Sequence, residues 1–199
     1  METLAALGPA ALFMISMSIT PGPNNVMLTA SGANYGFRRT LPHLLGILGG
    51  CFLLFSGVAL GLGMIFERFP LVQTSLRVIG SLYLLYLAWG IATAPPPRLG
   101  DIQGRPLSFW QAAAFQFANP KAWVMGLTLM ASFLPEDGNT MVNAFALAGA
   151  AELVAFPCIA LWAGFGMAIG RWLKGPRAWR VFNGTMGALT AACVIFILG

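Results

Sequence analysis

Long apolar stretches separated by short charged segments run through the whole chain. No Asp, Glu, Lys or Arg occurs in residues 3–37, 40–66, 78–97, 153–170 or 181–199. The stretch 106–135 contains one charged residue, Lys121, and 138–170 contains one, Glu152. A helix that crosses a bilayer needs about 20 predominantly apolar residues. The pattern therefore predicts an all-α polytopic membrane protein with six transmembrane helices, at about 4–34, 42–65, 74–93, 108–133, 140–169 and 178–198.

Composition supports this prediction and excludes an ordinary soluble enzyme. The 199 residues are 58% hydrophobic and 9% charged, whereas soluble domains have roughly 25% charged residues. The N-terminus carries Glu2 where a signal peptide has a basic region, so we expect the first span to remain in the mature protein. The cysteines lie inside apolar runs without paired spacing. We expect them to be small buried hydrophobic residues with no chemical role.

The basic residues indicate an orientation in the membrane. Of the 11 Lys and Arg residues, eight fall in loops on one side, at Arg38, Arg39, Arg98, Arg105, Arg171, Lys174, Arg177 and Arg180. The other side has Arg68 and Arg77, with an acidic loop at Glu136 and Asp137. The positive-inside rule places the first side in the cytoplasm, with both termini outside. A first segment lying on the membrane surface is the alternative, and it moves the N-terminus inside.

A weak internal repeat suggests how the spans are organised. Residues 61–78 share six identities in 18 positions with the residues 103 positions later, including Arg68 with Arg171 and Arg77 with Arg180. Two halves of three spans each must insert with opposite orientation, which is the inverted-repeat plan of many secondary transporters. We expect one transporter domain over 1–199, with repeat one at 1–97, a cytoplasmic loop at 94–107 and repeat two at 106–199. Glycine and arginine recurring at helix ends for packing reasons is the alternative.

Two segments in the middle of predicted spans contain prolines that interrupt a helix. Thr20-Pro21-Gly22-Pro23-Asn24-Asn25 lies within 4–34, and Asn119-Pro120-Lys121-Ala122 lies within 108–133. Proline cannot donate to the carbonyl four residues back and clashes with it. Spans one and four are therefore expected to be broken at these PGP and NPK motifs, with Thr20 and Asn119 as N-caps. Kinks that serve only packing are the alternative.

The new helix N-termini are candidate binding sites for a carboxylate. Such an end carries unpaired N–H groups and about half a positive charge, and neighbouring amides and an ammonium add donors. The predicted substrate-binding residues are Pro21, Gly22, Pro23, Asn24, Asn25, Gln116, Asn119, Pro120 and Lys121. Catalytic residues, metal ligands and cofactors are not expected.

Glu152 is the one acidic residue predicted to lie deep in a span. Ionisable groups inside a membrane are costly and by default indicate function. Three roles fit its chemistry: it receives a substrate ammonium, carries a coupling proton, or pairs with Lys121. If span five begins later, Glu152 instead lies among lipid headgroups.

Other polar and aromatic residues have weaker signals. His43 titrates in the physiological range when unperturbed, but its place at the start of span two is more typical of an interfacial polar group. Tyr83, Tyr86 and Trp89 are spaced by three along one helical face. Packing is the expected role of these aromatics, with cavity lining as the alternative.

At these residues the sequence resembles the LysE/RhtB family of amino-acid exporters. The matching segments are TPGPNN at 20–25, SGANYGFRR at 31–39, LPHLLGI at 41–47 and SFWQ…NPKAW at 108–123. AWGIAT, PLSFWQ and QFANPK are similar to the cysteine and O-acetylserine exporter branch. The resemblance implies export of a small amino acid or derivative (cysteine and O-acetylserine, or threonine and homoserine-like) across the inner membrane, driven by protons.

The expected partners are therefore an amino-acid substrate, protons and the lipid bilayer, and a homodimer is left open. Nucleic acid is excluded because the charges form no basic face. A divalent-cation exporter needs several oxygen ligands, and the one deep acid argues against it. An intramembrane enzyme needs a nucleophile–base pair or a metal cluster, which the sequence does not offer.

Overall fold

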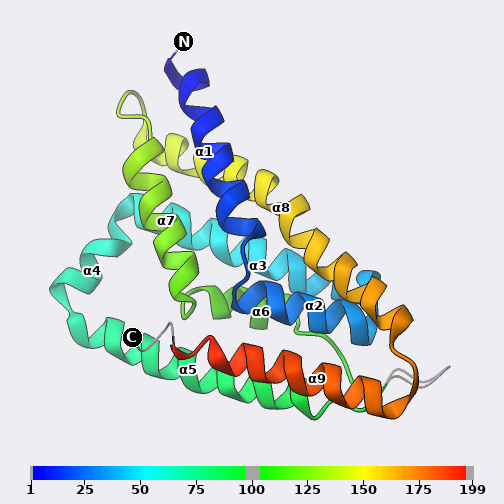
Figure 1. Ribbon diagram of the computed structural model, residues 1–199. Coiled ribbons are helices and arrows are strands. Elements are labelled where there is room, and N and C mark those ends of the chain that lie inside the picture. The colour runs from blue at the N-terminus through cyan, green and yellow to red at the C-terminus, as the bar shows by residue number, and fades with distance from the viewer. Residues whose placement is uncertain (1, 97–103, 196–199) are drawn as a thin grey trace.

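The computed structural model describes residues 2–96 and 104–195, and in these ranges the chain is helical with no strand (Figure 1). This confirms the all-α part of the prediction. In chain order the elements are α1 (Glu2–Ile19), α2 (Pro23–Tyr35), α3 (Phe37–Gly57), the π-helical turn η1 (Val58–Leu62), α4 (Gly63–Arg68), α5 (Pro70–Ala92), α6 (Phe109–Gln116), α7 (Pro120–Phe133), α8 (Thr140–Trp172) and α9 (Gly175–Ala192).

Three of the described helical stretches are long and apolar enough to cross a membrane. They are Phe37–Leu62, Pro70–Ala92 and Thr140–Trp172. The predicted first and fourth spans are each divided into two shorter helices, α1 with α2 and α6 with α7. Parts of the predicted loop at 94–107, including Arg98, and the end of the predicted sixth span lie outside the described residues.

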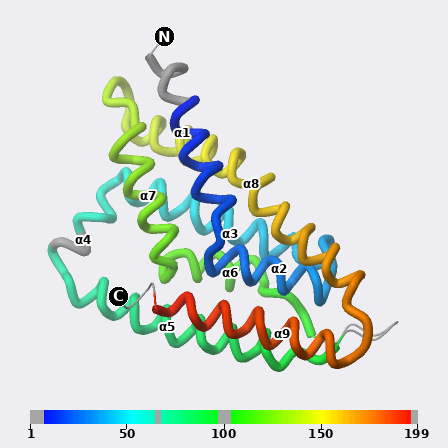
Figure 2. The backbone as a smooth tube through the Cα atoms, in the orientation of Figure 1, coloured from blue at the N-terminus to red at the C-terminus, as the bar shows by residue number. Residues whose placement is uncertain are grey.

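The second predicted span is interrupted where the sequence suggested a continuous helix over 42–65. Gly61 has a φ of 99°, which lies in the left-handed region, and glycine adopts this conformation without steric cost. The helix therefore widens into η1 and continues as α4 in a new direction (Figure 2). Gly164, which matches Gly61 in the sequence repeat, lies inside the unbroken helix α8, so these two glycines have different structural roles.

Helix α2 packs against α8 at very short distance because both helices present glycines at their crossing. A Cβ atom added to Gly32 would overlap the carbonyl of Ala163, and one added to Gly166 would overlap the carbonyl of Thr29. Small residues allow helix backbones to approach closely in this way. The contact anchors α2 on the longest helix of the bundle and so positions the first residues of α2.

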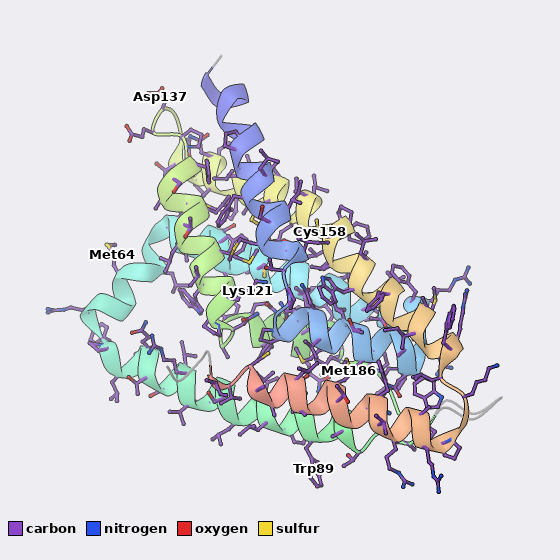
Figure 3. All side chains as sticks on the ribbon, in the orientation of Figure 1. Met64, Trp89, Lys121, Asp137, Cys158 and Met186 are labelled. Carbon is purple, nitrogen blue, oxygen red and sulfur yellow. The ribbon has the colours of Figure 1, made fainter. Side chains whose placement is uncertain are left out.

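The two ends of the bundle differ in charge. The end of α2, the end of α5 and the turn between α8 and α9 lie at the same end of the molecule (Figure 1). This end carries exposed basic residues at Arg38, Arg39, Arg105, Lys174 and Arg177. Asp137 lies in the α7–α8 loop at the opposite end (Figure 3).

Candidate functional site

The first break separates α1 from α2 at residues 20–22, and side chains satisfy the carbonyls that it frees. The Asn25 amide donates to the carbonyls of Ser18 and Thr20, each at 2.8 Å. The Thr20 hydroxyl donates to the carbonyl of Met17 at 2.9 Å. Gly22, not Thr20, is the N-cap of α2, with an extended backbone at φ −173°. The N-cap prediction for Thr20 is wrong because its hydroxyl closes the end of α1 instead.

The second break separates α6 from α7 at residues 117–119. Asn119 is the N-cap of α7, and its side-chain oxygen accepts from the N–H of Lys121 at 3.2 Å. The carbonyl of Asn119 accepts from the N–H groups of Ala122 and Trp123 at 3.0 and 3.3 Å. The Trp123 indole donates to the carbonyl of Phe117 at 2.8 Å. Asn119 therefore accepts hydrogen bonds from the backbone N–H groups at the start of α7.

The two new helix N-termini consequently differ in what they offer a ligand. The first N–H groups of a helix have no partner within it, and in α2 these belong to Asn24 and Asn25, since Pro23 has none. Within the described residues neither N–H group has a hydrogen-bond partner. The start of α2 is thus free to bind an anion, whereas the start of α7 is already capped.

Lys121 joins the two breaks at the centre of the bundle (Figure 3). Its ammonium donates to both the carbonyl and the hydroxyl of Thr20 at 2.8 Å. A Cβ atom added to Gly22 would lie 3.1 Å from Cδ of Lys121, so the lysine side chain runs along the glycine. Because the start of α2 is itself electropositive, the lysine and the helix end together make a positively charged centre.

A network of amide groups forms a second link between the two breaks. Asn24 and Gln116 exchange two hydrogen bonds, of 2.8 and 3.2 Å, and Gln116 is fully buried. The Gln116 side-chain oxygen also accepts from the amide of Asn119 at 3.2 Å and from the thiol of Cys51 at 3.6 Å. These bonds connect α2 and α3 with α6 and α7.

A small cavity of about 40 Å³ lies between the breaks. A water molecule occupies about 30 Å³ of the liquid, so this space holds water but is too small for an amino acid. The charged side chains that line it are Lys121 and Glu152. Glu152 is 9% exposed, and its Oε1 has no hydrogen-bond partner among the described residues. The structure therefore has a narrow central cavity lined by one cation and by one carboxyl group whose Oε1 has no hydrogen-bond partner among the described residues.

Most of the predicted site residues meet at this cavity. Those that line it are Gly22, Pro23, Asn24, Asn25, Asn119, Lys121 and Glu152. Pro21, Gln116 and Pro120 do not line it, although Gln116 bonds to three residues that do. The suggested pairing of Lys121 with Glu152 is not seen, because the ammonium bonds to Thr20.

The sequence did not identify the apolar walls of the cavity or the contact made by Cys51. Met14, Met17, Ile47, Met125 and Ile159 line the cavity together with Cys51. Nothing in the local pattern distinguishes these residues from other apolar residues of the spans. The expectation that the cysteines are buried is confirmed for Cys51, Cys158 and Cys193, and the Cys51 thiol in addition donates to Gln116.

The expectation for His43 is wrong, and the expectation for the three aromatics is confirmed only for Tyr83. His43 is 1% exposed and therefore buried, because helix packing covers the position that the sequence placed at the membrane interface. Tyr86 and Trp89 are 69% and 71% exposed, and both line a cavity between α2, α3, α5 and α6, which is the alternative role that the sequence left open. Of the three aromatics, Tyr83 packs inward, with its ring centroid 6.2 Å from that of Phe115.

The chain is similar to curated bacterial efflux proteins. Proteins named "Cysteine/O-acetylserine efflux protein" from Escherichia coli strain K12, Shigella sonnei strain Ss046 and Shigella flexneri are each 34% identical over 125 residues. The aligned region covers 61% of this chain and spans 62% of the length of these relatives. No solved structure matches the chain significantly.

The sequence profile of a transporter family matches a much larger part of the chain. The family is described as LysE type translocator, and the match covers residues 15–198. This range includes both breaks, Glu152 and every predicted span except the start of the first. The chain belongs to the family of LysE type translocators.

Proposed function

We propose that this protein is a secondary exporter of small amino acids or their derivatives across the bacterial inner membrane, driven by the proton gradient. The observation that carries the proposal is the uncapped start of α2 beside the Lys121 ammonium, at a cavity in the middle of the bundle. In a membrane, irregular backbone is tolerated where it is buried in protein or lines a cavity. The names of the curated relatives support an amino-acid substrate of the cysteine or O-acetylserine type.

The order of the helices supports an inverted repeat of three spans. A helix broken by proline, α1 with α2, is followed by α3 and α5, and a second broken helix, α6 with α7, is followed by α8 and α9. The α4–α5 turn and the α8–α9 turn lie at opposite ends of the bundle (Figure 1), as a repeat with reversed orientation requires. We propose that the two repeats rock against each other around the central cavity.

The substrate carboxylate binds at the N–H groups of Asn24 and Asn25 and beside Lys121 in this proposal. An anion there meets unpaired backbone donors and the positive end of the helix. Pro21, Gly22 and Pro23 shape this end, and Asn119 with Pro120 places Lys121 opposite it. The cavity must expand to admit an amino acid, and the bonds from Gln116 to Asn24 and from Lys121 to Thr20 are the ones that this expansion breaks.

Glu152 is the proposed partner for the coupling proton or the substrate ammonium. It lines the same cavity as Lys121 and is buried without a partner for Oε1. A single carboxyl group that alternately binds a proton and a substrate ammonium couples the entry of protons to the export of substrate. In this role the proton or the ammonium binds the carboxyl oxygen that has no hydrogen-bond partner among the described residues.

Replacing Glu152 by glutamine tests this role. We expect Glu152→Gln to insert and fold normally, because the amide has the same shape, and to lower proton-driven efflux by about tenfold or more, equivalent to about 1.4 kcal/mol. The measurement is efflux of labelled amino acid from proteoliposomes with an imposed pH gradient. Glu136→Gln, in the exposed α7–α8 loop, is the matched control and should export normally. Normal efflux by Glu152→Gln at every pH contradicts the coupling role.

The decisive experiment for the function is an efflux assay with several substrates. Proteoliposomes are loaded with labelled cysteine, O-acetylserine, threonine, lysine or a divalent cation, and efflux is measured with and without a pH gradient. We expect gradient-dependent efflux of a small neutral amino acid. Gradient-dependent efflux of the divalent cation alone makes the protein a cation exporter, and absence of efflux for every amino acid refutes the proposal.

A further inference from the structure

A second and larger cavity lies between α2, α3, α5 and α6. Its volume is about 490 Å³, within the range of roughly 300–1,000 Å³ that is usual for small-molecule sites. The residues with polar groups that line it are Ser31, Asn34, Tyr35, His43, Tyr86, Trp89, Arg105 and Gln111. Unlike the central cavity, this one has room for an amino acid as it stands.

His43 marks this cavity as a binding site for a polar ligand. Its side chain is 1% exposed, and neither ring nitrogen has a hydrogen-bond partner among the described residues. A neutral imidazole has one N–H donor and one acceptor, and leaving such groups buried and unpaired costs about 1–3 kcal/mol each. Both nitrogens are covered in this conformation, so a ligand or water bound in the cavity relieves this cost after the imidazole turns toward it.

The charge of the cavity indicates which ligands it selects. Arg105 is the charged residue among the described residues that line it, and no carboxylate does. A guanidinium binds a carboxylate through two parallel hydrogen bonds. Asn34 is already used, because its amide donates to the carbonyl of Ala30 and to Asn183. The free groups of the cavity therefore favour a small anion or zwitterion held by Arg105 and His43.

The cavity lies along the same helices as the central site. The first residues of α2 line the central cavity, whereas Met27, Ser31 and Tyr35 farther along α2 line the second one. On α3 the corresponding residues are Cys51 for the central cavity and His43 for the second. The second cavity is thus displaced toward the basic end of the bundle, beyond the hydrogen-bonded pair of Asn24 and Gln116.

We propose that the second cavity is a separate binding site for the amino-acid substrate on the basic side of the protein, where Arg105 and His43 bind the carboxylate before the substrate reaches the central site. This inference rests on the proposed export function and adds a first binding step to it. The Asn24–Gln116 pair separates the two sites and must open for the substrate to pass.

Protection of an introduced cysteine tests the proposal. Gly90 lines the second cavity, and a Cβ atom added there meets nothing within 4 Å, so Gly90→Cys is compatible with the fold. The variant is reconstituted in phosphatidylcholine vesicles, which supply no anionic lipid, and labelled with a membrane-impermeant maleimide. We expect O-acetylserine to slow labelling about fivefold at a concentration about four times its Kd. Ethanolamine, which has an ammonium but no carboxylate, should not slow it.

Background variants separate this site from the central one. In Gly90→Cys protein that also carries Arg105→Gln, we expect protection to be lost, whereas Arg177→Gln, an exposed basic residue outside the cavity, should leave it intact. Protection should also persist with Glu152→Gln, because the central site is not involved. The native chain without Gly90→Cys measures labelling of the buried cysteines Cys51, Cys158 and Cys193.

The outcomes distinguish this inference from the proposed function. Unchanged labelling with O-acetylserine, protection that survives Arg105→Gln, or protection that disappears with Glu152→Gln each overturns the second site. If the wild-type protein exports amino acids while labelling is unprotected, the export function stands and the second site does not. If labelling is protected while no amino acid is exported, the site stands and the export function does not.

Discussion

Replacing Pro21 and Pro23 together by alanine is expected to abolish export while leaving the protein inserted in the membrane. Alanine restores the two N–H groups that proline lacks, so the carbonyls of Met17 and Ile19 regain helical partners. A continuous helix over α1 and α2 removes the free N–H groups of Asn24 and Asn25, which form the proposed carboxylate site.

The measurement is gradient-driven efflux from proteoliposomes, together with the amount of protein in the membrane fraction. Pro9→Ala is the control, because Pro9 lies inside α1 without interrupting it and its replacement should leave efflux unchanged. If the double variant exports at the wild-type rate, transport does not depend on the prolines and the motif serves only packing.

Replacing Gly166 by leucine is expected to give the largest loss of stability of any single change considered. The new side chain would collide with the backbone of Thr29, which cannot move aside without displacing α2. Overpacking of this kind costs about 3 kcal/mol, and it also moves the start of α2 away from Lys121. Both folded protein and transport should therefore be reduced.

Gly164→Leu is the matched control because a Cβ atom added to Gly164, two residues away on the same helix, meets nothing within 4 Å. We expect Gly164→Leu to stay within about 0.5 kcal/mol of the wild type. The comparison is made by thermal denaturation in detergent and by size-exclusion chromatography. Equal stability of the two variants would show that the α2–α8 contact is looser than the structure has it.

The helix breaks were readable from the sequence because proline acts locally. Pro23 and Pro120 each begin a helix. Proline lacks an N–H group, which disfavours it inside a helix but suits it to the first helical position. The cap of α7 was likewise predicted, because Asn119 needs only its own side chain to bond the N–H of Lys121. Thr20 is not a cap because its hydroxyl donates to the carbonyl of Met17 at the end of α1, and it also accepts from Lys121, 101 residues away.

The faces of the helices were harder to read. Tyr83, Tyr86 and Trp89 share a spacing of three, yet Tyr83 packs against Phe115 and the others are exposed. In a lipid environment both the inner and the outer face of a helix are apolar, so hydrophobic periodicity does not tell them apart. For the same reason the sequence placed His43 at the membrane surface, although the packing of α3 against its neighbouring helices buries this side chain.

By itself, the sequence determined that this chain is an all-helical protein with apolar segments of membrane-spanning length, and where two of those segments break. Those properties follow from scarce charge and from the local geometry of proline, so no long-range contact is needed to read them. The tertiary structure decided which break keeps free donors, that Lys121 bonds to Thr20 and not to Glu152, and that His43 faces a second cavity. These outcomes depend on which residues of distant helices meet when glycines let the backbones pack closely. Local patterns in the sequence do not show which residues those are.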